Sequence, residues 1–245
     1  MTDPTAVTPT PPDNASMAED FIDIFVAPAK VYARRAKASP MVPFLTVWLV
    51  MIVLFFASKN VLQPIFDAQF QKSMAAQMKS NPQMTQDMVD KMKPMMNISI
   101  SIGAVVGIPV LLLVIALVTW VIGRFIMGGA FSFGTSLLIV SYSWFPKIIA
   151  SVIGLVEGLM MDVSKLTSPY QLSVSASRFF DPASMSDGVY QLLGQIDLFS
   201  IWGAVLVAIG LMYAGKLDKS KATIVAVIMF ACGCLPALFA VATGK

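Results

Sequence analysis

The stretch that decides the fold is residues 98–123, ISISIGAVVGIPVLLLVIALVTWVIG, which contains no charged side chain. A helix advances about 1.5 Å per residue, so about 20 apolar residues cross the roughly 30 Å of hydrocarbon in a bilayer. Similar apolar runs occupy residues 41–57, 137–161, 196–215 and 222–242. All are much longer than the roughly 10-residue strands of a membrane barrel. We therefore expect an all-α polytopic membrane protein with five transmembrane helices.

The composition excludes several functional classes. Hydrophobic residues make up 57% of the 245, and charged residues only 13%, about half of what a water-soluble domain carries. A net charge of +3 is too small and too dispersed for a nucleic-acid partner. The chain has no histidine, no Gly-x-Ser-x-Gly motif and no phosphate-binding glycine loop, so a Ser-His relay and a His-Glu zinc motif are absent. We expect a protein that is not an enzyme and that has neither a cofactor nor a resident metal.

The N-terminal region divides into two segments that precede the membrane domain, residues 39–245. Residues 1–20 are rich in Thr, Pro and Asp and are expected to form a disordered tail. Residues 21–38 read as an amphipathic interfacial helix whose apolar residues lead and whose basic residues follow. Its four cations are predicted to face lipid headgroups: Lys30, Arg34, Arg35 and Lys37.

These four positive charges before the first span also predict the orientation. Positive residues in short flanking segments stay on the cytoplasmic side, so the N-terminus is expected in the cytoplasm and, after five spans, the C-terminus outside. Arg124, also predicted to contact lipid headgroups, and Lys216, Lys219 and Lys221 fall in inner connections, although the first outer loop carries five lysines. The expected location is a bacterial inner membrane.

The first outer loop, residues 59–97, is rich in methionine and should be helical. Many of its methionines recur at four-residue spacing, and Pro82 divides the pattern into two helices. Thioethers suit Cu(I), which would make the loop a soft-metal site. The alternative is a flexible apolar face that packs on the bilayer, on the spans or on a partner.

The third run differs from the other four because it is polar at its start and is interrupted. Pro146 breaks the helix, and Lys147 follows at about mid-depth. An ionisable residue inside a span marks a functional site, yet a lysine can also snorkel or form a structural pair. Pro146 and Lys147 are therefore the candidate intramembrane functional residues.

Three carboxylates are expected near the outer ends of the third and fourth spans: Glu157, Asp162 and Asp197. Converging on one rim, they would bind a cation. Alternatively, they pair with Lys165 and Arg178 or are solvated separately.

Two Gly-x-x-x-Gly pairs predict close helix packing. Gly103 and Gly107 lie in the second span, and Gly154 and Gly158 in the third. Such pairs let backbones approach closely, either inside the bundle or at a contact between two copies of the chain.

The order of these elements resembles the Yip1-domain family of five-span membrane proteins, and its bacterial branch in particular. The matching stretches are Phe25-Val26-Ala27-Pro28 with Tyr32, Gly128-Gly129 with Ser132-Phe133, Ser141-Tyr142-Ser143 before Pro146, and Asp197-Leu198-Phe199-Ser200-Ile201-Trp202. The resemblance implies a cytoplasmic N-terminus and no known catalytic reaction. Eukaryotic relatives are linked to Rab-type GTPases and vesicle traffic, but their Asp-Leu-Tyr-Gly-Pro stretch and longer N-terminal region are missing here, so GTPase binding is not expected.

Two functional hypotheses remain open. In the first, a non-enzymatic membrane protein organises lipids, membrane or peripheral protein partners, or copies of itself. In the second, a small transporter or channel has a polar pathway near Lys147 and an acidic outer rim.

Overall fold

Helices make up almost all of the chain in the computed structural model, which describes residues 15–81, 83–162, 166 and 168–243. The α-helices are α1 (Met17–Val26), α2 (Pro28–Arg35), α3 (Met41–Ser80), α4 (Gln86–Ile102), α5 (Ile108–Val121), α6 (Phe133–Ser143), α7 (Phe145–Met160), α8 (Asp187–Gln195), α9 (Leu198–Tyr213) and α10 (Lys219–Ala242). The π-helical turns η1 (Gly103–Gly107) and η2 (Ile122–Ile126) continue α4 and α5, and three 3-10 turns are η4 (Pro169–Leu172), η5 (Ala176–Phe179) and η6 (Pro182–Ser184). The all-α class predicted from sequence is confirmed.

Four helical stretches of the described residues are long and apolar enough to cross a membrane. They are Met41–Ser80, Gln86–Ile126, Phe133–Met160 and Lys219–Ala242. The fourth predicted run, 196–215, instead forms the 16-residue helix α9. At 1.5 Å per residue α9 is about 24 Å long, which is shorter than the hydrocarbon layer.

Helix α6 is the centre of the bundle. All eight residues from 136 to 143 are buried, and α6 packs against α3, α5 and α9. Its serines tolerate burial because their hydroxyls donate to backbone carbonyls: Ser136 to Ala116 across the α5 interface at 2.7 Å, and Ser141 to Leu137 at 2.7 Å. The hydroxyls that make the start of the third run polar are therefore hydrogen-bonded inside the bundle.

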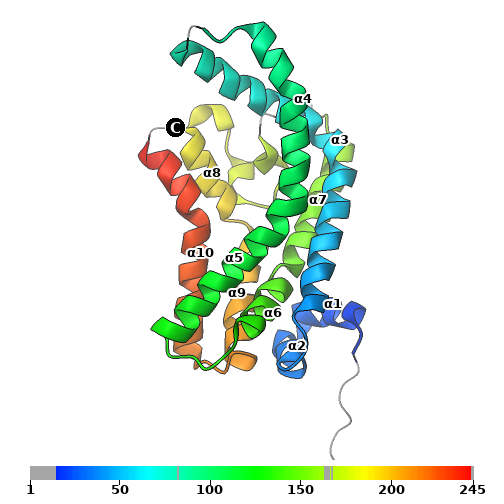
Figure 1. Ribbon diagram of the computed structural model, residues 1–245, viewed down its shortest axis with the longest axis vertical. Coiled ribbons are helices and arrows are strands. Elements are labelled where there is room, and N and C mark those ends of the chain that lie inside the picture. The colour runs from blue at the N-terminus through cyan, green and yellow to red at the C-terminus, as the bar shows by residue number, and fades with distance from the viewer. Residues whose placement is uncertain (1–14, 82, 163–165, 167, 244–245) are drawn as a thin grey trace, which may run out of the picture.

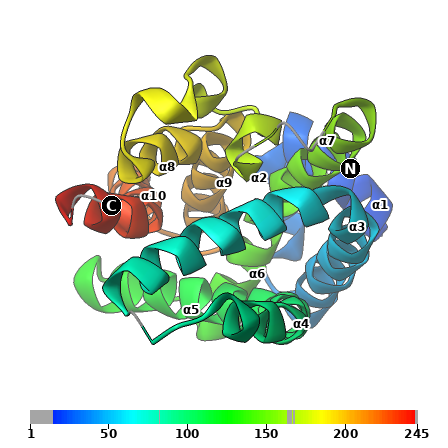
Figure 2. The ribbon, with the colours of Figure 1, turned by 90° about the horizontal axis from the view of Figure 1, so that it is seen from above.

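The first outer loop forms a helical hairpin with α3. Helix α3 is 40 residues long and continues from residue 58 to Ser80 past the end of its apolar run, with Pro64 inside it, and Figure 2 shows its outer part lying across the end of the bundle beside α4. Phe70, Met74 and Val89 form a small buried cluster within this hairpin, with Met78, Met84 and Met96 packed against it. These methionines pack within the hairpin itself, whereas Met88, Met92 and Met95 are exposed. Pro82 itself lies outside the described residues.

The N-terminal segment is two helices docked on the bundle. Helix α1 begins at Met17, behind a capping box between Ser16 and Glu19, so the tail expected over residues 1–20 is helical at its end. The rest of that expectation, residues 1–14, lies outside the described part. Ile24, Val31 and Tyr32 are fully buried, and α2 packs against α9. Part of the apolar surface predicted to lie on the membrane is therefore covered by protein, while Ile22 and Val26 stay exposed.

Figure 1 shows how the chain ends are arranged. Helices α1 and α2, the connection from α5 to α6 and the turn from α9 to α10 lie at one end of the bundle, drawn at the bottom. The C-terminal end of α10, α8 and the hairpin of α3 with α4 lie at the other. Following the orientation expected from the sequence, we call the first the inner end and the second the outer end.

Candidate functional site

The third span breaks at Trp144, two residues before the predicted proline. Helix α6 ends at Ser143, and α7 begins at Phe145 with Pro146 in its first turn, where a proline needs no hydrogen-bond partner. The backbone N–H of Trp144 donates to the Ser141 carbonyl at 3.2 Å, so this backbone group stays hydrogen-bonded at the break. Lys147 consequently lies on the first turn of a new helix, about 21 Å along the span from Phe133 at 1.5 Å per residue.

Lys147 faces the beginning of α9. Its ammonium group donates to the Asp197 carboxylate at 3.3 Å and to the Ser200 hydroxyl. Asp197 also caps α9, accepting from the backbone N–H groups of Phe199 and Ser200 at 2.9 Å each. One carboxylate thus neutralises the lysine and begins the short helix.

The polar segment around Ser175, which we call the returning segment, folds back to the depth of Lys147 and Asp197. Ser175 and Asp197 form an antiparallel bridge, in which Ala176 N–H donates to Ile196 at 3.0 Å and Leu198 N–H donates to Val174 at 3.3 Å. Non-helical backbone at membrane depth is tolerated only where protein or a water-filled cavity surrounds it. This segment therefore completes the bundle where α9 is too short.

A cavity of about 240 Å³ adjoins the ion pair. Its wall includes Lys147, Asp197, Tyr170, Ser173 and Gln195. Burial raises the pKa of the Tyr170 phenol, so this group is neutral at physiological pH. Among the described residues of the wall, only Lys147 and Asp197 carry a charge, and their side chains are 39% and 11% exposed.

This geometry bears on both interpretations of Lys147. The lysine has a carboxylate partner, as a structural role requires, and it also lines a polar cavity, as a transport role requires. Sequence reasoning missed the role of Ser200 and of the returning segment, although Asp197 directly before an apolar run is a helix N-cap signal.

The three predicted rim carboxylates have separate surroundings. Glu157 accepts from Arg178 at 2.7 Å, which is the pairing alternative, whereas Asp197 pairs with Lys147. Asp162 is exposed, and Lys165 lies outside the described residues. Among the residues that can be described, no group of three Asp, Glu, Cys or His side chains could hold a metal ion.

A second polar cluster lies between the N-terminal helices and α6. The Asp20 side chain is fully buried, and its carboxylate accepts from Arg34 at 2.5 Å, from Arg35 at 2.8 Å and from the Tyr142 hydroxyl at 2.5 Å. Arg34 also pairs with Asp23 at 2.8 Å. We call these five residues the N-terminal latch.

The latch changes the predicted lipid contacts. Arg34 and Arg35 direct their guanidinium groups to Asp20, so they are neutralised within the protein. Lys30 and Lys37 stay exposed, while Arg124 is exposed and donates to the Phe131 carbonyl at 3.0 Å. Sequence reasoning missed Asp20 and Tyr142, since they are far apart in the chain and Asp20 fell at the edge of the predicted tail.

The two glycine pairs differ in their surroundings. A Cβ at Gly158 would lie 2.8 Å from Val61 Cγ1, so α7 and α3 approach closely there. Gly154 faces the Leu172 carbonyl, at 3.6 Å from a Cβ. Gly103 and Gly107 have nothing within 4 Å of such an atom. Within the described chain, only the pair in α7 contributes to internal packing.

The comparisons with known proteins agree with this architecture. The Yip1 domain model matches residues 22–241, from α1 to the end of α10. The membrane protein YknW of Bacillus subtilis (strain 168) is 30% identical over 129 residues, which are 52% of this chain and 52% of YknW. The chain thus spans about half the length of that curated relative, and no solved structure matches it. Since the match extends from within α1 to the last turn of α10 and so covers well over half of the chain, the chain belongs to the Yip1 domain family of membrane proteins.

Proposed function

We propose that the chain is a five-span, non-enzymatic protein of a bacterial inner membrane that gathers anionic lipids at its inner end and so organises the membrane around it. The N-terminus is cytoplasmic and the C-terminus is outside. Protein partners, including further copies of the chain, would be held at the same end. GTPase binding is not part of the proposal.

The observation that carries the proposal is the charge at the inner end. Asp20 and Asp23 neutralise Arg34 and Arg35, so the positive charge left at this surface comes from other residues. Within the described chain these cations are exposed and form no ion pair: Lys30, Lys37, Arg124, Lys216, Lys219 and Lys221. Clustered cations at a membrane surface attract anionic headgroups by about 1 kcal/mol each.

Five crossings are supported by the direction of the chain. The inner end holds α1, α2 and the turn from α9 to α10, and the outer end holds the C-terminal end of α10 (Figure 1). An odd number of crossings separates the two ends, so α9 counts as a crossing although it is short. The returning segment next to Asp197 supplies the remaining depth.

The test measures lipid selectivity around the reconstituted protein. Spin-labelled phosphatidylglycerol and phosphatidylcholine are compared in vesicles that hold the full chain, and the motionally restricted fraction is measured for each. We expect selectivity for phosphatidylglycerol that weakens at about 0.5 M salt, because screening shortens the reach of surface charges. Lys30→Gln combined with Lys37→Gln should reduce it, whereas Lys79→Gln, in the outer hairpin, should not. Equal fractions for both lipids, or saturable solute flux in the same vesicles, would contradict the proposal.

A small transporter or channel is the second candidate. The ion pair of Lys147 with Asp197 beside a 240 Å³ polar cavity favours it, because buried charges at helix interruptions mark transport pathways. Flux of ions or small anions into vesicles that is saturable and is lost in Lys147→Met would support this candidate. Unchanged background leakage in both proteins would remove it.

A further inference from the structure

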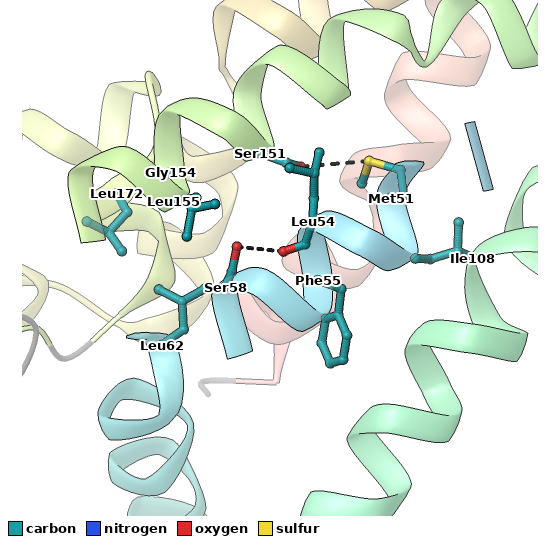
Figure 3. Close-up of a pocket in the computed structure, with 10 residues that line it drawn as sticks. All are labelled: Met51, Leu54, Phe55, Ser58, Leu62, Ile108, Ser151, Gly154, Leu155 and Leu172. Carbon is teal, nitrogen blue, oxygen red and sulfur yellow. Dashed lines mark hydrogen bonds between the residues drawn. The ribbon is translucent and has the colours of Figure 1, made fainter. Parts of the chain in front are cut away.

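A second cavity, of about 250 Å³, lies between α3 and α7 (Figure 3). Met51, Leu54, Ser58 and Leu62 of α3 form one side, and Gly154 and Leu155 of α7 form the other. From Met41, Met51 is about 15 Å and Leu62 about 31 Å along α3, at 1.5 Å per residue. The cavity therefore lies lengthwise in the outer half of the hydrocarbon layer.

The side chains of this wall are mostly apolar. Its two hydroxyl hydrogens are already used: Ser58 donates to the Leu54 carbonyl at 2.8 Å, and Ser151 donates to the Lys147 carbonyl at 2.9 Å. Figure 3 shows the Ser58 bond and a longer contact from Ser151 to the Met51 sulfur. A cavity with such a wall favours apolar ligands.

A cation directly follows the wall residue Ser58 in α3, beside the outer part of the cavity. Lys59 is three residues before Leu62 and about 27 Å along α3, close to the outer headgroup level. Its ammonium group donates to the Ser101 hydroxyl at 2.8 Å, and none of the described ion pairs includes it. By contrast, Lys72, Lys91 and Lys93 in the same hairpin each pair with an aspartate.

We infer that the cavity binds one acyl chain of an outer-leaflet phospholipid, whose phosphate contacts Lys59. An apolar slot along the membrane normal with the Lys59 cation beside its outer part matches a phospholipid in shape and charge. The inference extends the proposed lipid-organising function to a specific site. It is independent of the basic inner end, which lies on the other side of the membrane.

Gly154→Leu is designed to fill the cavity. A Cβ at Gly154 meets only the Leu172 carbonyl, at 3.6 Å, so the backbone can stay in place while the leucine side chain occupies the void. Gly233→Leu is the matched control, since position 233 in α10 is open, with nothing within 4 Å. Both changes replace a helical glycine with a better helix former, so folding should be retained.

The experiment uses full-length protein in nanodiscs of phosphatidylglycerol and phosphatidylethanolamine with a trace of phospholipid carrying a diazirine on its acyl chain. After irradiation, wild type should be labelled at Met51 and Leu155, inside the cavity, and at Val53, which is 67% exposed to lipid. Gly154→Leu should lower the first two labels about fivefold, because the filled void excludes the chain, and should spare Val53. Gly233→Leu should match wild type.

Native mass spectrometry of the released protein identifies the occupant. A retained phospholipid mass that is lost in Gly154→Leu and weakened in Lys59→Gln supports the inference. A retained free fatty acid, or labels at Met51 and Leu155 that do not respond to Gly154→Leu, would overturn it. Loss of anionic selectivity at the inner end would refute the proposed function while leaving these labels unchanged.

Discussion

Replacing Asp20 with Asn should release the N-terminal helices from the bundle without unfolding the spans. The Asp20 carboxylate is buried and accepts from two arginines and from Tyr142, which lies 122 residues away in the chain. Asn keeps the size of the side chain but removes its charge. The two guanidinium groups then lose their shared carboxylate, and α1 and α2 lose their charged link to α6.

The magnitude follows from the burial of the partners. Removing one member of a buried ion pair costs about 3–5 kcal/mol, because the other charge stays buried and unpaired. Arg34 keeps its contact with Asp23, and the two arginine side chains are 12% and 24% exposed, so solvent offsets part of the loss. We expect about 2–3 kcal/mol, which is a roughly 30- to 150-fold rise in the undocked fraction.

Hydrogen exchange of the protein in nanodiscs measures this fraction directly. Amides of residues 17–35 should exchange faster in Asp20→Asn by roughly that factor, while amides of α6 and α9 should keep their protection. Asp23→Asn is the matched control, because Asp23 is 34% exposed and, in the described part of the chain, forms its ion pair with Arg34 alone. It should change exchange by less than about 1 kcal/mol. Equal exchange in the two variants would refute the latch.

Three further predictions concern other parts of the bundle. Burial raises the pKa of the Tyr32 phenol well above its usual 10, so docking of α2 should be stable below pH 10 and weaken as the pH rises further. Tyr32→Phe should abolish the loss of docking that Tyr32 ionisation causes. An alkaline titration that follows tyrosinate absorbance and proteolysis of residues 17–35 measures both effects. Asp197→Ala should lower the free energy of unfolding by about 2 kcal/mol in thermal or denaturant unfolding, because both the helix cap and the pairing with Lys147 are lost. Asp197→Asn should cost under about 1 kcal/mol, since Asn still caps α9 and the lysine is partly solvated. Equal losses in the two variants would show that the ion pair, not the cap, dominates. Gly188→Ala should destabilise the protein by about 1–3 kcal/mol, because its Cβ would collide with the backbone of α10. Gly233→Ala should be neutral or slightly stabilising, since nothing lies within 4 Å of a Cβ there. Thermal unfolding of the two variants in the same detergent compares them, and a neutral Gly188→Ala would mean that α8 and α10 are more loosely packed.

The sequence predicted the helical class and the approximate helix positions, because crossing a bilayer requires long uncharged runs and internal backbone bonding. Runs 98–123 and 222–242 lie within helical stretches that can span. The fourth run was predicted too long. Its outer limit was set by apolar composition, whereas Asp197 begins the helix by accepting backbone N–H groups and by pairing with Lys147.

The sequence predicted Lys147 as a site residue but not the partners that it meets. Lys147 was noticeable because a charge inside an apolar run is unusual. Its partners Asp197 and Ser200 lie some 50 residues away, and no local pattern indicates which carboxylate a lysine will meet. Arg34 and Arg35 were assigned to lipid for the same reason, since their partner Asp20 lay at the edge of the expected tail.

The sequence by itself thus determined that this chain is a helical membrane protein, because the cost of unsatisfied backbone groups in lipid leaves few other choices for such long apolar runs. Only the tertiary structure decided which charges are paired and which stay free. Electrostatic pairing depends on distances of a few ångströms between helices that are far apart in sequence. The Asp20 latch, the pairing of Lys147 with Asp197 and the unpaired Lys59 beside an apolar cavity all follow from how the helices pack.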